Sequence, residues 1–109
     1  MKVLQVINSG KSVLVRVELH EVEEESAIYN DLHEEMAKRG FVRTLKQGNK
    51  EVELPSGMYR MPDVTDIAGT HEKAVETAKT VCRKHSLPAP GVMTMDGTSA
   101  RQSGLYSKE

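Results

Sequence analysis

Three features of the sequence predict an α+β fold with two helices on one face of an antiparallel sheet. Apolar and polar residues alternate through Ser12–His20, as in a strand buried on one side. A helical segment that ends at Gly40 leads directly into a second strand. Two further strands then flank a second helical segment. The order β-α-β-β-α-β is that of the ferredoxin-like arrangement, which has a four-stranded antiparallel sheet.

Length and composition limit the classes of function. The 109 residues suffice for one domain, and the 28% charged and 38% hydrophobic residues are typical of a soluble globular protein. The net charge of -1 provides no overall basic field, so nucleic-acid binding would need a local basic patch. The single cysteine excludes an intrachain disulfide and favours a reducing cytoplasm. We find no signal peptide, and no apolar run approaches the roughly 20 residues of a membrane span.

The chain divides into three parts. Residues 1–11 are expected to form an N-terminal arm or an extra edge strand, and residues 12–95 form the ferredoxin-like domain. Residues 96–109 are polar and rich in glycine and serine, so we expect a disordered tail. Histidine and cysteine do not occur at zinc spacing, and no glycine-rich nucleotide loop is present. No metal or cofactor is therefore expected.

The first helix is predicted from Ser26, a good N-cap residue, to the glycine stop at Gly40. Its apolar stripe has helical spacing: Tyr29, Leu32 and Met36. The following residues, Phe41–Leu45, are rich in β-branched and apolar side chains and predict a strand. This helix, glycine and strand form one local α-β unit on which the rest of the chain packs.

The second half begins with a polar turn at Gln47–Lys50, followed by a third strand that Pro55 interrupts. Met58–Met61 is expected to resume this strand at a sheet edge. Thr70 is expected to cap a second helix that runs to about His85. Val92–Met95 is the last predicted strand.

The sheet face away from the helices carries the candidate functional residues of the first strand. Arg16, Glu18 and His20 project from it toward the uncovered side. Arginine can hold a phosphate with two hydrogen bonds, and histidine can move a proton near neutral pH. We therefore predict Arg16 as an RNA-binding residue and His20 as a catalytic residue.

Neighbouring strands contribute three further candidates. Arg43 is predicted to be catalytic, because ribonucleases without a metal need a cation beside the developing phosphorane. Tyr59 is predicted to stack on a base, and Arg60 to bind phosphate. Two alternatives stay open. Arg16, Glu18 and Arg43 could form cross-strand ion pairs on a solvated face. Arg43 could also lie on the inner face, because it has the parity of Phe41.

The segments LHEEMAKRGFVRTL and VELPSGMY resemble the GhoS-type proteins, endoribonuclease antitoxins of type V toxin–antitoxin systems. The shared pattern is a helix that ends around Gly-Phe, then Arg-Thr, a polar turn and a Leu-Pro strand that ends near a tyrosine. The residues that carry it are Gly40, Phe41, Arg43, Thr44, Leu54, Pro55 and Tyr59.

The resemblance spans roughly residues 12–95 and implies a ferredoxin-like fold, binding of single-stranded RNA and cleavage of a toxin messenger RNA in the cytoplasm. It assigns no catalytic residue by itself. Two alternatives use the same fold. One is a non-catalytic protein-interaction module, which includes a homodimer. The other is an inhibitor encoded by a phage or mobile element.

Overall fold

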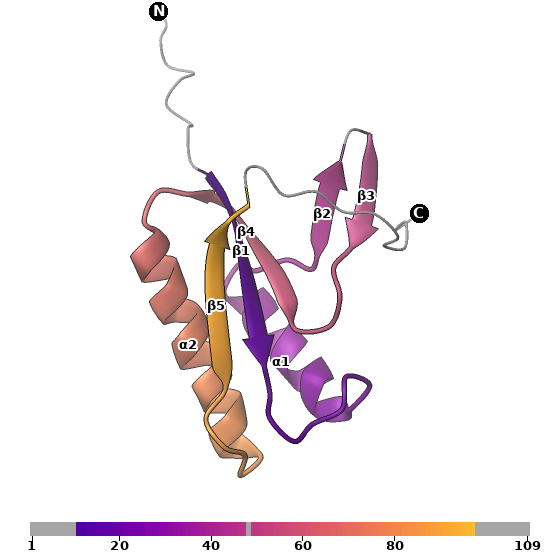
Figure 1. The fold of residues 1–109 in the computed structure, drawn as a ribbon, viewed down its shortest axis with the longest axis vertical. Coiled ribbons are helices and arrows are strands. Elements are labelled where there is room, and N and C mark those ends of the chain that lie inside the picture. Colours follow the sequence, from indigo (N-terminus) through magenta and orange to yellow (C-terminus); the bar gives the residue numbers. More distant parts are fainter. Residues whose placement is uncertain (1–10, 48, 98–109) are drawn as a thin grey trace, which may run out of the picture.

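The computed structural model describes residues 11–47 and 49–97, so nearly all of the expected N-terminal arm and of the expected tail lies outside the described residues. Five strands and two helices make up these ranges (Figure 1): β1 (Lys11–Glu18), α1 (Ala27–Lys38), β2 (Thr44–Gln47), β3 (Lys50–Glu53), β4 (Met58–Val64), α2 (Ile67–Lys84) and β5 (Gly91–Asp96).

The strands form two antiparallel sheets. The larger has the order β4-β1-β5, with Leu14 of β1 between Arg60 of β4 and Met95 of β5. The smaller is the β2–β3 hairpin. The two sheets meet at one bridge, where Val42 N donates to Arg60 O at 2.8 Å and Arg60 N donates to Val42 O at 2.7 Å. The α+β class is therefore confirmed, while the expected four-stranded sheet is divided into three strands and a hairpin.

A turn between β3 and β4 explains why the sheet is divided. Met58 N donates to Pro55 O at 3.0 Å, and Gly57 has a φ of +85°, which favours glycine. The chain therefore reverses after β3 instead of continuing in line. Met58–Val64 then forms β4, which pairs with β1 at the edge of the larger sheet, so the predicted edge strand at Met58–Met61 is confirmed.

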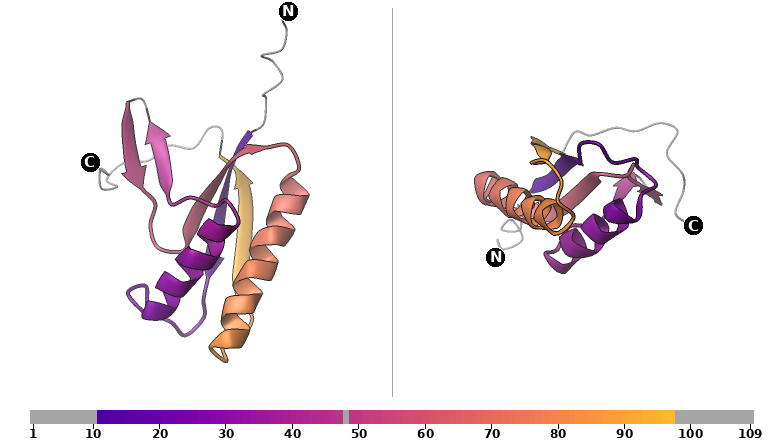
Figure 2. Two further views of the ribbon diagram at one scale, coloured as in Figure 1. Left: turned by 180° about the vertical axis from the view of Figure 1, so that it is seen from behind. Right: turned by 90° about the horizontal axis from the view of Figure 1, so that it is seen from below.

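Both helices pack on the same face of the larger sheet (Figure 2). The core lies between them and the inward side chains of β1, as the alternation predicts. Its largest fully buried side chains are those of Tyr59, Phe41, Leu32, Met36, Val13, Val15, Val17, Val81 and Thr77. In the part of the chain that the structure describes, neither helix combines the length and the apolar character that crossing a membrane requires.

The ends of α1 follow the sequence prediction. The Ser26 side chain accepts a hydrogen bond from Ile28 N at 3.1 Å. At the other end, Gly40 has a φ of +94°, and its N–H donates to Ala37 O at 3.0 Å. Phe41 N donates to the carbonyl of Met36 at 3.1 Å, which completes a Schellman motif. This motif holds Phe41, and hence the chain that follows it, against the end of the helix.

The second helix begins earlier than predicted. Its N-cap is Asp66, whose carboxylate accepts from Gly69 N at 2.9 Å, so Thr70 lies within the first turn and is not the cap. The Thr70 hydroxyl donates back to Asp66 O at 3.0 Å. Both Asp and Thr favour cap positions, and the earlier of the two begins the helix here.

Candidate functional site

Arg43 lies on the same side of the chain as the helices. Val42 is bridged to Arg60, which is opposite Leu14 on the outer face of the sheet. Because successive side chains alternate, the residues on either side of Val42 point inward. Phe41 is accordingly buried in the core, and Arg43 is half-buried beside α1. The alternative that Arg43 shares the face of Phe41 is therefore the one observed.

His33 of α1 and Tyr59 of β4 meet beneath the helix. The Tyr59 hydroxyl lies 2.6 Å from His33 Nδ1, and the two rings pack edge to face with centroids 5.7 Å apart. The hydroxyl has no other acceptor among the described residues, so we assign it as the donor to Nδ1. The proton of the neutral imidazole then lies on Nε2, which is free to donate a hydrogen bond.

Electrostatics keep this pair neutral. Burial and, to a smaller extent, the positive charge of Arg43 together lower the pKa of His33 from 6.5 to about 4. Burial also raises the pKa of Tyr59 well above its usual value of 10.0. Near neutral pH, the site therefore combines an uncharged imidazole and an uncharged phenol with one guanidinium.

Arg43 is an incompletely satisfied cation. Its Nη2 donates to Leu54 O at 2.8 Å, while its backbone carbonyl accepts from Leu54 N at 2.8 Å. Its Nε is buried and has no hydrogen-bond partner. No carboxylate within the described residues forms an ion pair with Arg43. A half-buried guanidinium without a counterion favours an anionic ligand.

Arg43 and His33 line a groove between α1 and the β2–β3 hairpin, which we call the Arg43 groove. It has a volume of about 460 Å³. Its lining combines apolar side chains with Arg43, His33 and two carboxylates, those of Glu34 and Glu53. The complete lining is His33, Glu34, Ala37, Phe41, Val42, Arg43, Thr44 and Glu53.

Two of the predicted site residues require correction. Tyr59 is fully buried beneath α1, so the prediction that it lies on the open face and stacks on a base was wrong. Its neighbour across the register is Val15, a core residue, which explains the inward orientation. His20 is exposed but does not join Arg43. Arg43 follows the bridge level with Leu14, Glu18 lies roughly 13 Å further along β1, and His20 lies beyond it.

The remaining predicted residues lie on the outer face. Arg16 is exposed between Met58 and Met93 of the neighbouring strands. Arg60 is half-buried, and its Nε donates to Thr44 O at 2.7 Å, which helps to hold the hairpin. The cross-strand ion pairs considered for Arg16, Glu18 and Arg43 do not form among the described residues.

Sequence reasoning did not select His33, although its position carries a signal. His33 is four residues after Tyr29 and three before Met36, both of which are buried, so helical spacing places it on the inner face of α1. A histidine at the border of an apolar stripe is placed to form a hydrogen bond with a polar side chain of the sheet, as His33 does with the Tyr59 hydroxyl. Its partner, Tyr59, could not be found in this way, because the register of β4 was not known.

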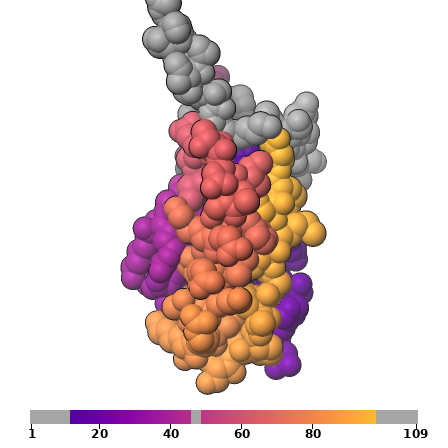
Figure 3. All heavy atoms as spheres, turned by 90° about the vertical axis from the view of Figure 1, so that its left-hand side faces the viewer, coloured from indigo at the N-terminus to yellow at the C-terminus, as the bar shows by residue number. Residues whose placement is uncertain are grey.

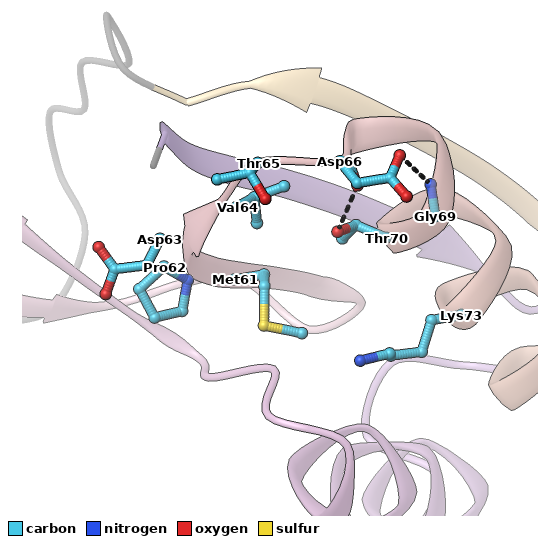
Figure 4. Close-up of a pocket in the computed structure, with 9 residues that line it drawn as sticks. All are labelled: Met61, Pro62, Asp63, Val64, Thr65, Asp66, Gly69, Thr70 and Lys73. Carbon is cyan, nitrogen blue, oxygen red and sulfur yellow. Dashed lines mark hydrogen bonds between the residues drawn. The ribbon is translucent and has the colours of Figure 1, made fainter. Parts of the chain in front are cut away.

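A second hollow, of about 400 Å³, lies where β4 leads into α2 (Figure 4). Lys73 extends across it toward Met61, while the Asp66 carboxylate turns back to cap its own helix. None of the predicted site residues lines this hollow. Among the described residues, no group of three or more His, Cys, Asp or Glu side chains is arranged to hold a metal ion. The Arg43 groove is therefore the better candidate.

Comparisons of the chain with protein-family models, with curated proteins and with solved structures find no match. The functional argument therefore depends on the groove itself.

Proposed function

We propose that the chain binds single-stranded RNA in the Arg43 groove, with a backbone phosphate held by Arg43 and His33. The observation that carries the proposal is the half-buried Arg43 guanidinium, which has no carboxylate partner among the described residues. Arginine suits a phosphate because its donors match two oxygens at once. The neutral His33 adds one N–H donor without a second positive charge.

We further propose that the groove cleaves the RNA that it binds. The Glu53 carboxylate takes the proton of a ribose 2′-hydroxyl, and the 2′-oxygen attacks the adjacent phosphorus. The bond to the 5′-oxygen breaks, this oxygen takes a proton from water, and a 2′,3′-cyclic phosphate remains. Arg43 and His33 stabilise the additional negative charge of the phosphorane. In this scheme Arg43 keeps the catalytic role expected from the sequence, while Glu53 replaces His20.

The resemblance to GhoS-type antitoxins supports this choice of ligand. Three of the residues that carry it, Phe41, Arg43 and Thr44, line the groove. The same resemblance extends the proposal to a toxin messenger RNA as the cellular target. We also propose that the fold is a ferredoxin-like sheet, β5-β1-β4-β2, in which β2 separates from β4 after the Val42–Arg60 bridge.

Two matched variants test binding and cleavage separately. The full chain is incubated with a fluorescent AU-rich single-stranded RNA, with and without a chelator, and binding is measured by anisotropy. Arg43→Met keeps the aliphatic length but removes the cation, and should weaken binding by about tenfold, because a charge-assisted hydrogen bond contributes about 1.5–3 kcal/mol. Glu53→Gln removes only the base and should abolish the cyclic-phosphate product while RNA remains bound.

The control is Arg16→Met, which removes an exposed arginine from the opposite face of the sheet. It should leave cleavage unchanged and reduce binding by less than Arg43→Met. Equal RNA binding by the native protein and Arg43→Met would refute the groove as the binding site. Binding without a cyclic-phosphate product from the native protein would refute the cleavage step and leave an RNA-binding module.

A further inference from the structure

We propose that β5 pairs with β5 of a second copy of this chain, which joins the two larger sheets across a two-fold axis. This inference is independent of RNA binding. It concerns the side of the molecule in Figure 3, where β5 lies at the surface beside α2. The Arg43 groove is at the other end of the strand order, next to β4.

The outward backbone groups of β5 follow from the register. Gly97 N donates to Ser12 O at 2.7 Å, so the backbone of Gly97 points toward β1. Because the hydrogen-bonding direction alternates along a strand, Met95 and Met93 also point toward β1. Val92 and Thr94 therefore direct their N–H and C=O groups away from the sheet. No described residue pairs with these groups.

The other sheet edges carry features that block pairing, whereas β5 carries fewer. In β3, charged residues surround Val52 in the sequence KEVE. The free part of β4 contains Pro62, followed by Asp63 with a φ of +55°. Proline, charges and irregular backbone all prevent strand addition. In contrast, β5 has no proline, and its one charged residue is Asp96 at its C-terminal end.

Antiparallel pairing makes this edge complementary to itself. Val92 and Thr94 of one copy can exchange hydrogen bonds with Thr94 and Val92 of the other, because groups that point outward must face each other. This pairing also brings the exposed Met93 side chains of the two copies beside each other at the two-fold axis. Met93 is 61% exposed. A partner is expected to cover such surface. A second copy of this chain is thus the partner that this edge fits, because an antiparallel copy presents the same outward groups of Val92 and Thr94 in the matching alternation.

The test measures the mass of the full chain in solution over a wide concentration range, by light scattering after gel filtration. The native protein should have twice the mass of one chain at high concentration. Thr94→Pro removes the outward N–H and should weaken dimerisation by about tenfold or more, since each lost hydrogen bond contributes about 1 kcal/mol. Thr94→Val is the matched control: both substitutions remove the 2.7 Å hydrogen bond between Thr94 Oγ1 and His71 Nδ1, but valine keeps the N–H. It should remain dimeric.

One further measurement keeps the test valid if Thr94→Pro fails to fold. Hydrogen exchange of the Thr94 amide in the native protein should slow as concentration rises, while the inward Met93 amide is protected throughout. A native monomer at every concentration would overturn the proposal. A dimer with concentration-independent Thr94 exchange, or one that Thr94→Pro and Thr94→Val affect equally, would also overturn it.

Discussion

Acid should destabilise the fold through His33. Its imidazole has a pKa of about 4 in the folded protein instead of 6.5, mainly because of burial. Between these two values the unfolded chain binds more protons than the folded chain. The free energy of unfolding should therefore decrease as the pH falls from 7 toward 4. The contribution is fully present above pH 6.5 and is lost as the pH approaches the folded pKa.

The magnitude follows from the two pKa values. Linkage predicts a loss of about 2 kcal/mol between pH 7 and pH 5 for an imidazole fully shielded from water. His33 is only half-buried, so solvent screening reduces this to about 1 kcal/mol. Two carboxyl groups with lowered pKa, Asp31 and Glu35, have ordinary values of 3.8 and 4.5 and lose their contributions at lower pH. Between pH 7 and pH 5, the change in the free energy of unfolding therefore reports on His33 and not on these two carboxyl groups.

Urea unfolding at pH 7, 6 and 5 measures this effect, with His33→Gln as the control. Glutamine takes no proton in this range and can still accept a hydrogen bond from Tyr59. The native protein should lose about 1 kcal/mol more than the variant on acidification. The other histidines are present in both proteins, so their effects cancel. Equal losses in the two proteins would refute the assignment of a neutral, protected imidazole at this site.

Four further substitutions test the fold, each by thermal or urea unfolding. Gly57→Ala should be more destabilising than Gly40→Ala. Both have positive φ, but a Cβ at Gly57 would lie 2.6 Å from Val17 O, whereas one at Gly40 meets only a flexible side chain at 3.5 Å. Equal losses would contradict this packing. Asp66→Ala should cost about 1 kcal/mol by removing the α2 cap. Asp31→Asn should cost less than about 1 kcal/mol, and salt should reduce its effect, because the lost pairs with Lys84 and His85 are near the surface.

The local structure of the first half of the chain could be predicted from its residues. The N-cap at Ser26, the buried stripe of α1 and the stop at Gly40 depend on contacts within a few residues of one another. The alternation in β1 correctly identified its buried face for the same reason. Capping hydrogen bonds and side-chain periodicity depend on the residues of a short segment alone, so they can be predicted from that segment.

The pairing of strands could not be predicted in this way. Whether Met58–Val64 continues β3 or turns to join β1 depends on the positive φ of Gly57 and on its close approach to Val17 O. That contact joins residues 40 positions apart, and no local pattern encodes it. The pairing of β4 with β1 also places Tyr59 in the core and not on the open face.

The candidate site shows this difference most clearly. The sequence by itself determined that a helix ends at Gly40 and that Arg43 follows it closely. Only the tertiary structure decided that Arg43 lies beside His33 and Tyr59, because these three side chains come from a connecting segment, a helix and a strand whose register is set by long-range pairing. The pKa of His33 and the buried, unpartnered Nε of Arg43 are likewise properties of the assembled site, since both depend on burial.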